Sequence, residues 1–239
     1  MTTYVLVHGA WHGAWCWNKV VPGLEAAGHR VLTPDLPGSG EDATPASDVT
    51  LKAYANRLVE LLDEQNEKVI MLGHSMGGLA ISAAAELRPD KIGGLVYLSG
   101  FLPQSGQSLL SLEESNPNSS IPPALIVAED HVTGRVQADR IKELFYHDCS
   151  DEDVAFAIAH QHAQALAPLA TPVTVTDENF GSVPRYYILL TEDRAIHPDM
   201  QRQMIAASPC KEVFEIASSH SPFYSKTAEL VETLLKISV

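Results

Sequence analysis

The stretch that decides the fold is Val69-Ile70-Met71-Leu72-Gly73-His74-Ser75-Met76-Gly77, which matches the pattern G-x-S-x-G. Its first four residues are apolar, as in a buried strand, and the residues after it are small and favour a closely packed helix. In this context the pattern predicts a nucleophile elbow, a strained turn that holds a serine hydroxyl out at the edge of a sheet. Glycines two positions on either side would let strand and helix approach closely. Ser75 is therefore the predicted nucleophile.

Short apolar runs alternate with segments of helical period on both sides of this turn. The alternation predicts an α/β fold with a mostly parallel sheet and helices on both faces. Strands are predicted at 4–7, 30–33, 68–72, 95–98, 185–190 and 212–216, and helices at 17–27, 51–64, 75–87, 199–207 and 225–235. With 239 residues, 45% of them hydrophobic, the chain can bury one sizeable core, so we expect a single domain spanning 1–239.

The interval from about residue 101 to residue 181 interrupts this alternation. It holds six prolines, helical pieces at 138–145 and 151–166, and no strand signal. Structureless loops of this length are rare, so we expect a small helical cap inserted into a core formed by 1–100 and 182–239. Such a cap would cover the carboxyl edge of the sheet, where open α/β sheets bind ligands. It is expected to set substrate choice, through bulky residues such as Phe156 and Leu166, without taking part in the chemistry.

A nucleophilic serine needs a base and a carboxylate that orients the base, and in this fold both follow the serine along the chain. Only His197 and His220 come after the cap, and His220 lies in a loop of small residues after the last predicted strand. Asp193 directly follows the strand before it and is favoured over Glu192, whereas Asp199 is expected to begin the next helix. An acid at this place could also be a helix cap or a surface charge. The predicted base is His220 and the predicted carboxylate is Asp193.

The reaction also needs two N–H donors for a developing oxyanion. The first is the N–H of the residue after the nucleophile, Met76. For the second, His8-Gly9-Ala10 follows the first predicted strand and offers the N–H of Ala10. The alternative is that His8-Gly9 is simply a tight exit from the strand, and both interpretations can hold together.

Composition excludes several other functions. Sixteen Lys and Arg against thirty Asp and Glu give a net charge of −14, which argues against nucleic acid as a partner. No apolar run reaches the ~20 residues of a membrane span, no export signal is visible, and three widely spaced cysteines fit reduced thiols. We therefore expect a cytoplasmic protein without membrane contact. We expect neither a metal nor a cofactor, and the oligomeric state is open, with a homodimer as one option.

The sequence also resembles the plant methylesterase and hydroxynitrile lyase family of α/β-hydrolases, with its bacterial esterase relatives. The resemblance covers nearly the whole chain and rests on VLVHGAWHGAW at 5–15, LEAAGH at 24–29, KVI at 68–70, GHSMGG at 73–78, DENFGSV at 177–183 and TED at 191–193. It implies the α/β-hydrolase fold and a triad of Ser75, Asp193 and His220. It also implies oxyanion donors at Ala10 and Met76.

The resemblance implies hydrolysis of a small-molecule carboxylic ester through an acyl-enzyme. Two alternatives remain, a lyase that cleaves cyanohydrins and a ligand receptor that has kept a hydrolase fold. In the lyases a Lys directly follows the catalytic His, and a Thr hydroxyl contacts the substrate oxygen. The matching positions here are Ser221, which carries no charge, and Gly9, which is expected to leave open space beside Ala10. The interval before the segment at 177–183 is shorter than in the plant enzymes, so their substrates are not carried over.

Overall fold

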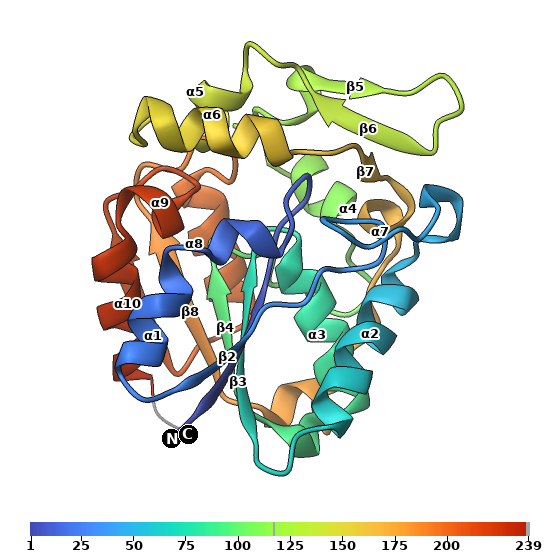
Figure 1. Ribbon diagram of the computed structural model, residues 1–239. Coiled ribbons are helices and arrows are strands. Elements are labelled where there is room, and N and C mark those ends of the chain that lie inside the picture. Colours follow the sequence, from blue (N-terminus) through green and yellow to red (C-terminus); the bar gives the residue numbers. More distant parts are fainter. Residues whose placement is uncertain (117, 238–239) are drawn as a thin grey trace.

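The computed structural model describes residues 1–116 and 118–237 (Figure 1). Its main sheet has six strands, and every neighbouring pair is parallel. In spatial order the strands are β2 (Arg30–Leu32), β1 (Thr3–Val7), β3 (Val69–His74), β4 (Ile92–Leu98), β8 (Arg185–Leu190) and β9 (Glu212–Ile216). The predicted strands are confirmed, with ends that shift by up to three residues.

Helices cover both faces of this sheet (Figure 1). The longer ones are α1 (Val20–Ala26), α2 (Leu51–Asp63), α3 (Gly77–Leu87), α8 (Pro198–Ala207) and α10 (Thr227–Lys236). α1 packs against α10, and α2 packs against α3. In α2 the buried residues recur every three or four positions, from Leu51 and Tyr54 to Leu58 and Leu61, so one face turns to the core. α3 is buried almost all round, which its small residues permit.

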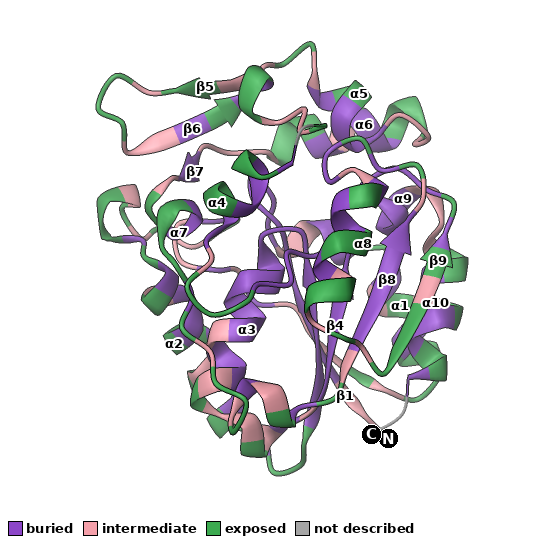
Figure 2. Cartoon of the chain, turned by 180° about the vertical axis from the view of Figure 1, so that it is seen from behind, coloured by how far each residue is buried: buried purple, intermediate pink, exposed green. Residues whose placement is uncertain are grey.

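The core lies in the sheet itself (Figure 2). All six residues of β3 are buried, and so are six of the seven residues of β4. Strands covered by helices on both faces need apolar side chains in both directions, which is why these segments are continuous apolar runs.

Most of the chain between β4 and β8 lies over the carboxyl edge of the main sheet (Figure 1). It contains the short helices α4 (Leu109–Glu114), α5 (Ile141–Phe145), α6 (Asp151–His160) and α7 (Ala167–Ala170). It also contains a three-stranded antiparallel sheet of β5 (Leu125–Val127), β6 (Thr133–Val136) and β7 (Gln164–Ala165). The prediction that this region has no strands is therefore wrong.

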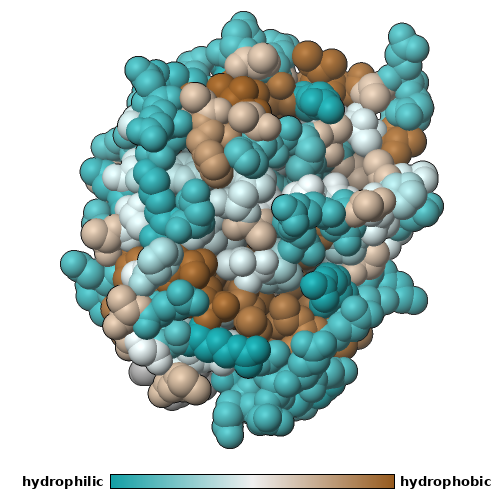
Figure 3. Space-filling model, viewed as in Figure 1, coloured by the Kyte–Doolittle hydropathy of each residue, from teal (hydrophilic) through white to brown (hydrophobic). Residues whose placement is uncertain are grey.

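The physical reason lies in the length and pairing of these strands. They have two to four residues, too few for a period to show in the sequence. The helix predicted over 151–166 ends at His160, because Gln161 is extended and β7 pairs with β6. On the outer side of this region Ile126 and Ile158 are exposed, and Figure 3 shows apolar atoms at the top of the molecule.

Within residues 1–116 and 118–237, no helix combines the length and the apolar character needed to cross a bilayer. Cys16 is buried, and Cys149 and Cys210 are half-buried free thiols. Burial raises the pKa of Cys149 to about 12 and that of Cys210 to about 11, so both remain thiols rather than nucleophilic thiolates.

Candidate active site

Ser75 lies in the turn between β3 and α3 with a positive φ of 53°, the strained geometry that the sequence predicts. The turn is held by three backbone bonds: Ser75 donates its N–H to Leu98 (3.3 Å), and its carbonyl accepts from Gly78 and Phe101 (both 3.0 Å). A Cβ on Gly73 would lie 2.6 Å from the carbonyl oxygen of Gly77. Glycine is required there because strand and helix cross too closely for a side chain. The helix predicted from residue 75 begins at Gly77, because the positive φ of Ser75 is not a helical conformation.

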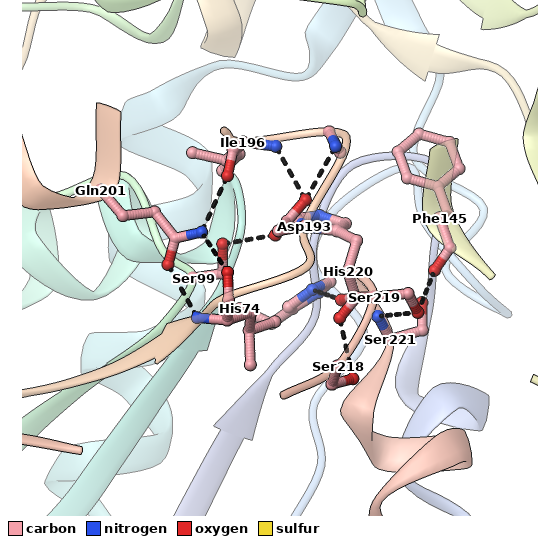
Figure 4. A network of polar contacts seen from close by, with 12 residues as sticks. His74, Ser99, Phe145, Asp193, Ile196, Gln201, Ser218, Ser219, His220 and Ser221 are labelled. Atoms are coloured by element: carbon pink, nitrogen blue, oxygen red, sulfur yellow. Dashed lines mark hydrogen bonds and ion pairs between the residues drawn. The ribbon is translucent and has the colours of Figure 1, made fainter. Parts of the chain in front are cut away.

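Asp193 and His220 are brought together from the ends of two neighbouring strands, β8 and β9 (Figure 4). His220 Nδ1–H donates to Asp193 Oδ2 at 2.6 Å, and both side chains are buried. The second oxygen, Oδ1, accepts from the N–H groups of Ala195 (2.7 Å) and Ile196 (2.9 Å), and Ser99 Oγ donates to Oδ2 (2.7 Å). The Asp193 carboxylate thus accepts four hydrogen bonds. Because one of them holds the proton on Nδ1 of His220, the Nε2 atom of His220 is free to act as a base.

Sequence analysis missed two residues of this network. Ser99 directly follows β4, the neighbour of β8, and polar residues at the carboxyl ends of adjacent parallel strands meet at one edge. That rule would have identified it. Gln201 on α8 bonds both the N–H and the carbonyl of Leu190 and the carbonyl of Ile196, and so fixes the loop that carries Asp193 (Figure 4). Its sequence position carries no signal for this role.

Buried histidines support the turn around Ser75. His74 Nε2–H donates to the carbonyl of His220 (2.8 Å), and burial holds the pKa of His74 well below its usual range. His12 Nδ1–H donates to the carbonyl of Ala10 (2.7 Å), and its Nε2 accepts from the Tyr146 hydroxyl (2.5 Å). Burial lowers the pKa of His12 to about 3. Both imidazoles are therefore neutral. His74 fixes the backbone at His220, and His12 fixes the loop at residue 10.

The two predicted oxyanion donors lie on the elbow and on the loop after β1. In the part of the chain that the structure describes, neither the Ala10 N–H nor the Met76 N–H donates to a protein acceptor. Trp11 has a φ of 64°, and two bonds hold it: its N–H donates to Gln164 Oε1 (3.2 Å) and its Nε1–H donates to the carbonyl of Gly134 (3.0 Å). Residues of β6 and β7 therefore position the loop that carries Ala10.

Gly9 does not leave the open space that the sequence analysis expects. A Cβ there would lie 2.9 Å from the Ser75 Cβ and 3.0 Å from His74 Nδ1. Glycine is needed because the loop packs directly against the elbow, and a threonine side chain would displace Ser75 or His74. Ser221, the other position at which the sequence analysis contrasts the chain with the lyases, is fully buried, and its Oγ has no partner among the described residues.

A family model described as the alpha/beta hydrolase family matches residues 4–233. The chain belongs to the alpha/beta hydrolase family. The match agrees with the fold and the elbow described above, and it confirms the predicted fold class.

Individual relatives narrow the resemblance further. The hydrolase is 34% identical to methylesterase 9 of Arabidopsis thaliana, over 100% of this chain and 98% of the relative. Among solved structures it is similar to polyneuridine aldehyde esterase, with a TM-score of 0.90, 28% identity and full coverage of both chains. It is also similar to a pyrethroid hydrolase of Sphingobium faniae, with a TM-score of 0.89 and 31% identity over 98% of this chain and 96% of the other. The predicted kinship with plant methylesterases is confirmed.

Ser75 and His220 face the same cavity, which holds about 80 Å³ between the main sheet and the cap. No hydrogen bond joins the Ser75 hydroxyl to His220 among the described residues. In a hydrolase without substrate this bond is often long, and it shortens when substrate binds. Most of the walls are apolar, among them Trp11, Phe101, Leu109, Phe145, Leu169 and Ile196.

Phe156 and Leu166 do not line this cavity, so the structure does not support the expectation that they set substrate choice by direct contact. Phe156 packs against the rings of Trp15 and His160. Leu166 lies against Gly134 of β6. Cap residues at the cavity come instead from α4, α5 and α7, among them Leu109, Phe145 and Leu169, and from the segment 121–125.

One acidic side chain, Glu113, lies in the apolar cavity wall, and burial raises its pKa to about 7 from an ordinary value of 4.5. On unfolding it regains the ordinary value, so between pH 4.5 and 7 the folded state binds more protons and stability falls as pH rises. Glu113→Gln removes this titration. We expect the free energy of unfolding of this variant to exceed that of the native protein. The difference should grow between pH 4.5 and 7, to about 3 kcal/mol, and stay constant above pH 7.

The measurement is urea unfolding of both proteins between pH 4 and pH 8. Glu114→Gln is the matched control, because Glu114 is exposed on the same helix and its substitution should change stability by less than about 0.5 kcal/mol. A stability difference for Glu113→Gln that does not change with pH would contradict the raised pKa.

Proposed function

We propose that this hydrolase cleaves a carboxylic ester of a small molecule through an acyl-enzyme on Ser75. The observation that supports the proposal most strongly is the buried bond of 2.6 Å between His220 and Asp193, beside an elbow whose serine faces the same cavity as His220. The sequence similarity to methylesterases agrees with this assignment.

In the proposed mechanism Ser75 Oγ attacks the ester carbonyl carbon while His220 Nε2 accepts its proton. The negative charge that develops on the carbonyl oxygen is stabilised by the N–H groups of Ala10 and Met76. Collapse of this intermediate breaks the bond to the alcohol oxygen, which takes the proton from His220. Water then attacks the acyl-enzyme by the same route, and Asp193 stabilises the imidazolium in both halves.

The cavity limits the size of the group that it can hold. At about 80 Å³ it has roughly half the volume of a ~150 Å³ protein cavity that accommodates benzene. With the cap in this position, a short aliphatic group fits and a large aromatic group does not. We therefore propose esters in which the part that enters the cavity has only a few carbon atoms.

An ester panel that includes mandelonitrile and the smaller, aliphatic acetone cyanohydrin tests this proposal against cyanohydrin cleavage. We expect hydrolysis of short-chain methyl and aryl esters and no cyanide release above the buffer background. A departing cyanide ion needs a nearby cation, and the cavity is lined by no Lys or Arg among the described residues. Steady cyanide release that is lost in Ser75→Ala would assign the protein to the lyases. Binding of these esters without any turnover would identify a receptor instead.

Leu169 of α7 should limit the length of the chain that fits the cavity, because it is buried in the cavity wall. We expect Leu169→Ala to raise kcat/KM for hexanoate relative to butanoate esters several-fold, since removing a leucine side chain leaves a cavity. Leu166→Ala is the matched control, because Leu166 lies three residues away in the same cap and does not line the cavity. Labelling of Ser75 by a small organophosphonate should survive in both variants. An equal change of the hexanoate-to-butanoate ratio in both variants would show that the cap influences chain length through its overall packing and not through Leu169.

A further inference from the structure

Glu113 is the one acidic residue among the described residues that line the cavity with Ser75 and His220. It lies on α4 and only 4% of its surface is exposed. Ser119 Oγ donates to its Oε2, and Oε1 is buried with no hydrogen-bond partner in the described part of the chain. Half of this carboxyl group is therefore satisfied by the protein, and the other half is not.

The surroundings of Glu113 give it no compensating charge. Apolar side chains such as Leu109, Ile121 and Leu125 form the nearby walls, and no Lys or Arg is among the described residues of the cavity. A buried polar atom without a partner is costly, and native proteins keep few of them. On a residue that lines the cavity shared by Ser75 and His220, such an oxygen favours a ligand that supplies the missing bond.

A hydroxyl group suits Oε1 better than an ammonium group does. Burial raises the pKa of Glu113 to about 7, so its ionised and protonated forms coexist near neutral pH. A hydroxyl both donates and accepts and can bond either form, whereas an ammonium group needs the ionised form. An ammonium group would also place a second cation in the cavity that His220 shares, and His220 must become a cation during the reaction.

On the basis of the function proposed above, we propose that Glu113 is a specificity-determining residue whose Oε1 binds a hydroxyl group of the substrate. The substrate class is then short esters that carry a hydroxyl, on either the acyl or the alcohol part. A site that bonds a substrate hydroxyl discriminates strongly against an analogue that lacks it, because the polar atom of the site is then left without a partner.

Two matched pairs of esters test the assignment and separate the two parts of the substrate. Methyl 3-hydroxybutanoate, as separate enantiomers, is compared with methyl 3-methylbutanoate. 2-Hydroxyethyl butanoate is compared with propyl butanoate. We expect kcat/KM to be roughly tenfold or more higher for the hydroxy ester in at least one pair, the order of effect of one buried hydrogen bond.

Variants at residue 113 identify the origin of that preference. In Glu113→Leu the ratio should fall to about one, whereas Glu113→Gln should keep part of it, because an amide still bonds a hydroxyl. Glu114→Leu is the control on the exposed side of the same helix and should keep the native ratio. If Glu113 had a purely structural role, its substitution would change kcat/KM equally for both esters of a pair, and the ratio would stay the same.

Binding of the same esters to Ser75→Ala, with and without Glu113→Leu, gives a readout that does not depend on turnover. Loss of the hydroxyl preference in the double variant would support the assignment even if the proposed chemistry were wrong. Three results would overturn the assignment. The native protein could show a ratio near one for both pairs of esters, or the ratio could survive in Glu113→Leu. The third is a preference for methyl 3-aminobutanoate over both hydroxy esters. If the native protein bound the esters with the hydroxyl preference but did not turn them over, only the proposed function would be contradicted.

Discussion

Replacement of Ser75 by alanine is expected to lower the turnover number for esters by about 10⁶-fold, as removal of the nucleophile does in other serine hydrolases. The substitution removes the oxygen that would form the acyl bond. It should leave the fold intact, because the Ser75 hydroxyl makes no hydrogen bond to the described residues. The turn is held by backbone bonds, which alanine keeps.

The measurement is the turnover of a short-chain aryl ester together with thermal unfolding. Ser221→Ala is a matched control, because Ser221 is a buried serine directly after His220, and its Oγ has no partner in the described residues. We expect near-native activity in that control and unchanged melting in both variants. Full activity of purified Ser75→Ala would remove Ser75 from the mechanism.

Asp193→Asn is expected to lower the turnover number by roughly 10⁴-fold, the loss seen when the triad aspartate of another serine hydrolase is changed in this way. The asparagine carbonyl would remain with the N–H groups of Ala195 and Ile196, which require an acceptor. The amide NH₂ would then face Ser99 and His220. His220 Nδ1 would have to accept, and the proton would move to Nε2, so that the imidazole could no longer take the proton of Ser75.

Asp199→Asn is the control for that prediction. Asp199 lies in the first turn of α8, as the sequence predicts, with an exposed side chain near Arg202. Its substitution should leave the turnover number within about twofold, since exposed ion pairs contribute little. A larger loss for Asp199→Asn than for Asp193→Asn would mean that the orienting carboxylate is misassigned.

The parts of this site that sequence predicts well are those set by local geometry. The elbow is encoded within five residues, because the serine needs a positive φ and Gly73 has no room for a side chain. His220 and Asp193 could be predicted as partners because each lies in the loop after a strand of a parallel sheet, and such strand ends converge at one edge.

The parts that sequence could not predict depend on contacts between distant segments. The sequence around Gln201 and Gln164 gives no sign of their contacts. The fold places Gln201 beside the loop of Asp193 and Gln164 beside Trp11. The short strands of the cap have no period of their own and form only by pairing. Glu113 likewise carries no distinctive signal in the sequence, and only the packing of the cap makes it part of the cavity wall.

The most direct test of the account is to locate the covalent bond. The native hydrolase is treated with a small organophosphonate, digested and examined by mass spectrometry, beside Ser75→Ala. We predict one adduct per chain, on the peptide that contains Ser75, with loss of ester turnover in proportion to labelling and no adduct in the variant. Undiminished turnover of a fully labelled protein, or inactivation with the adduct on another residue, would contradict the assignment of Ser75 as the nucleophile.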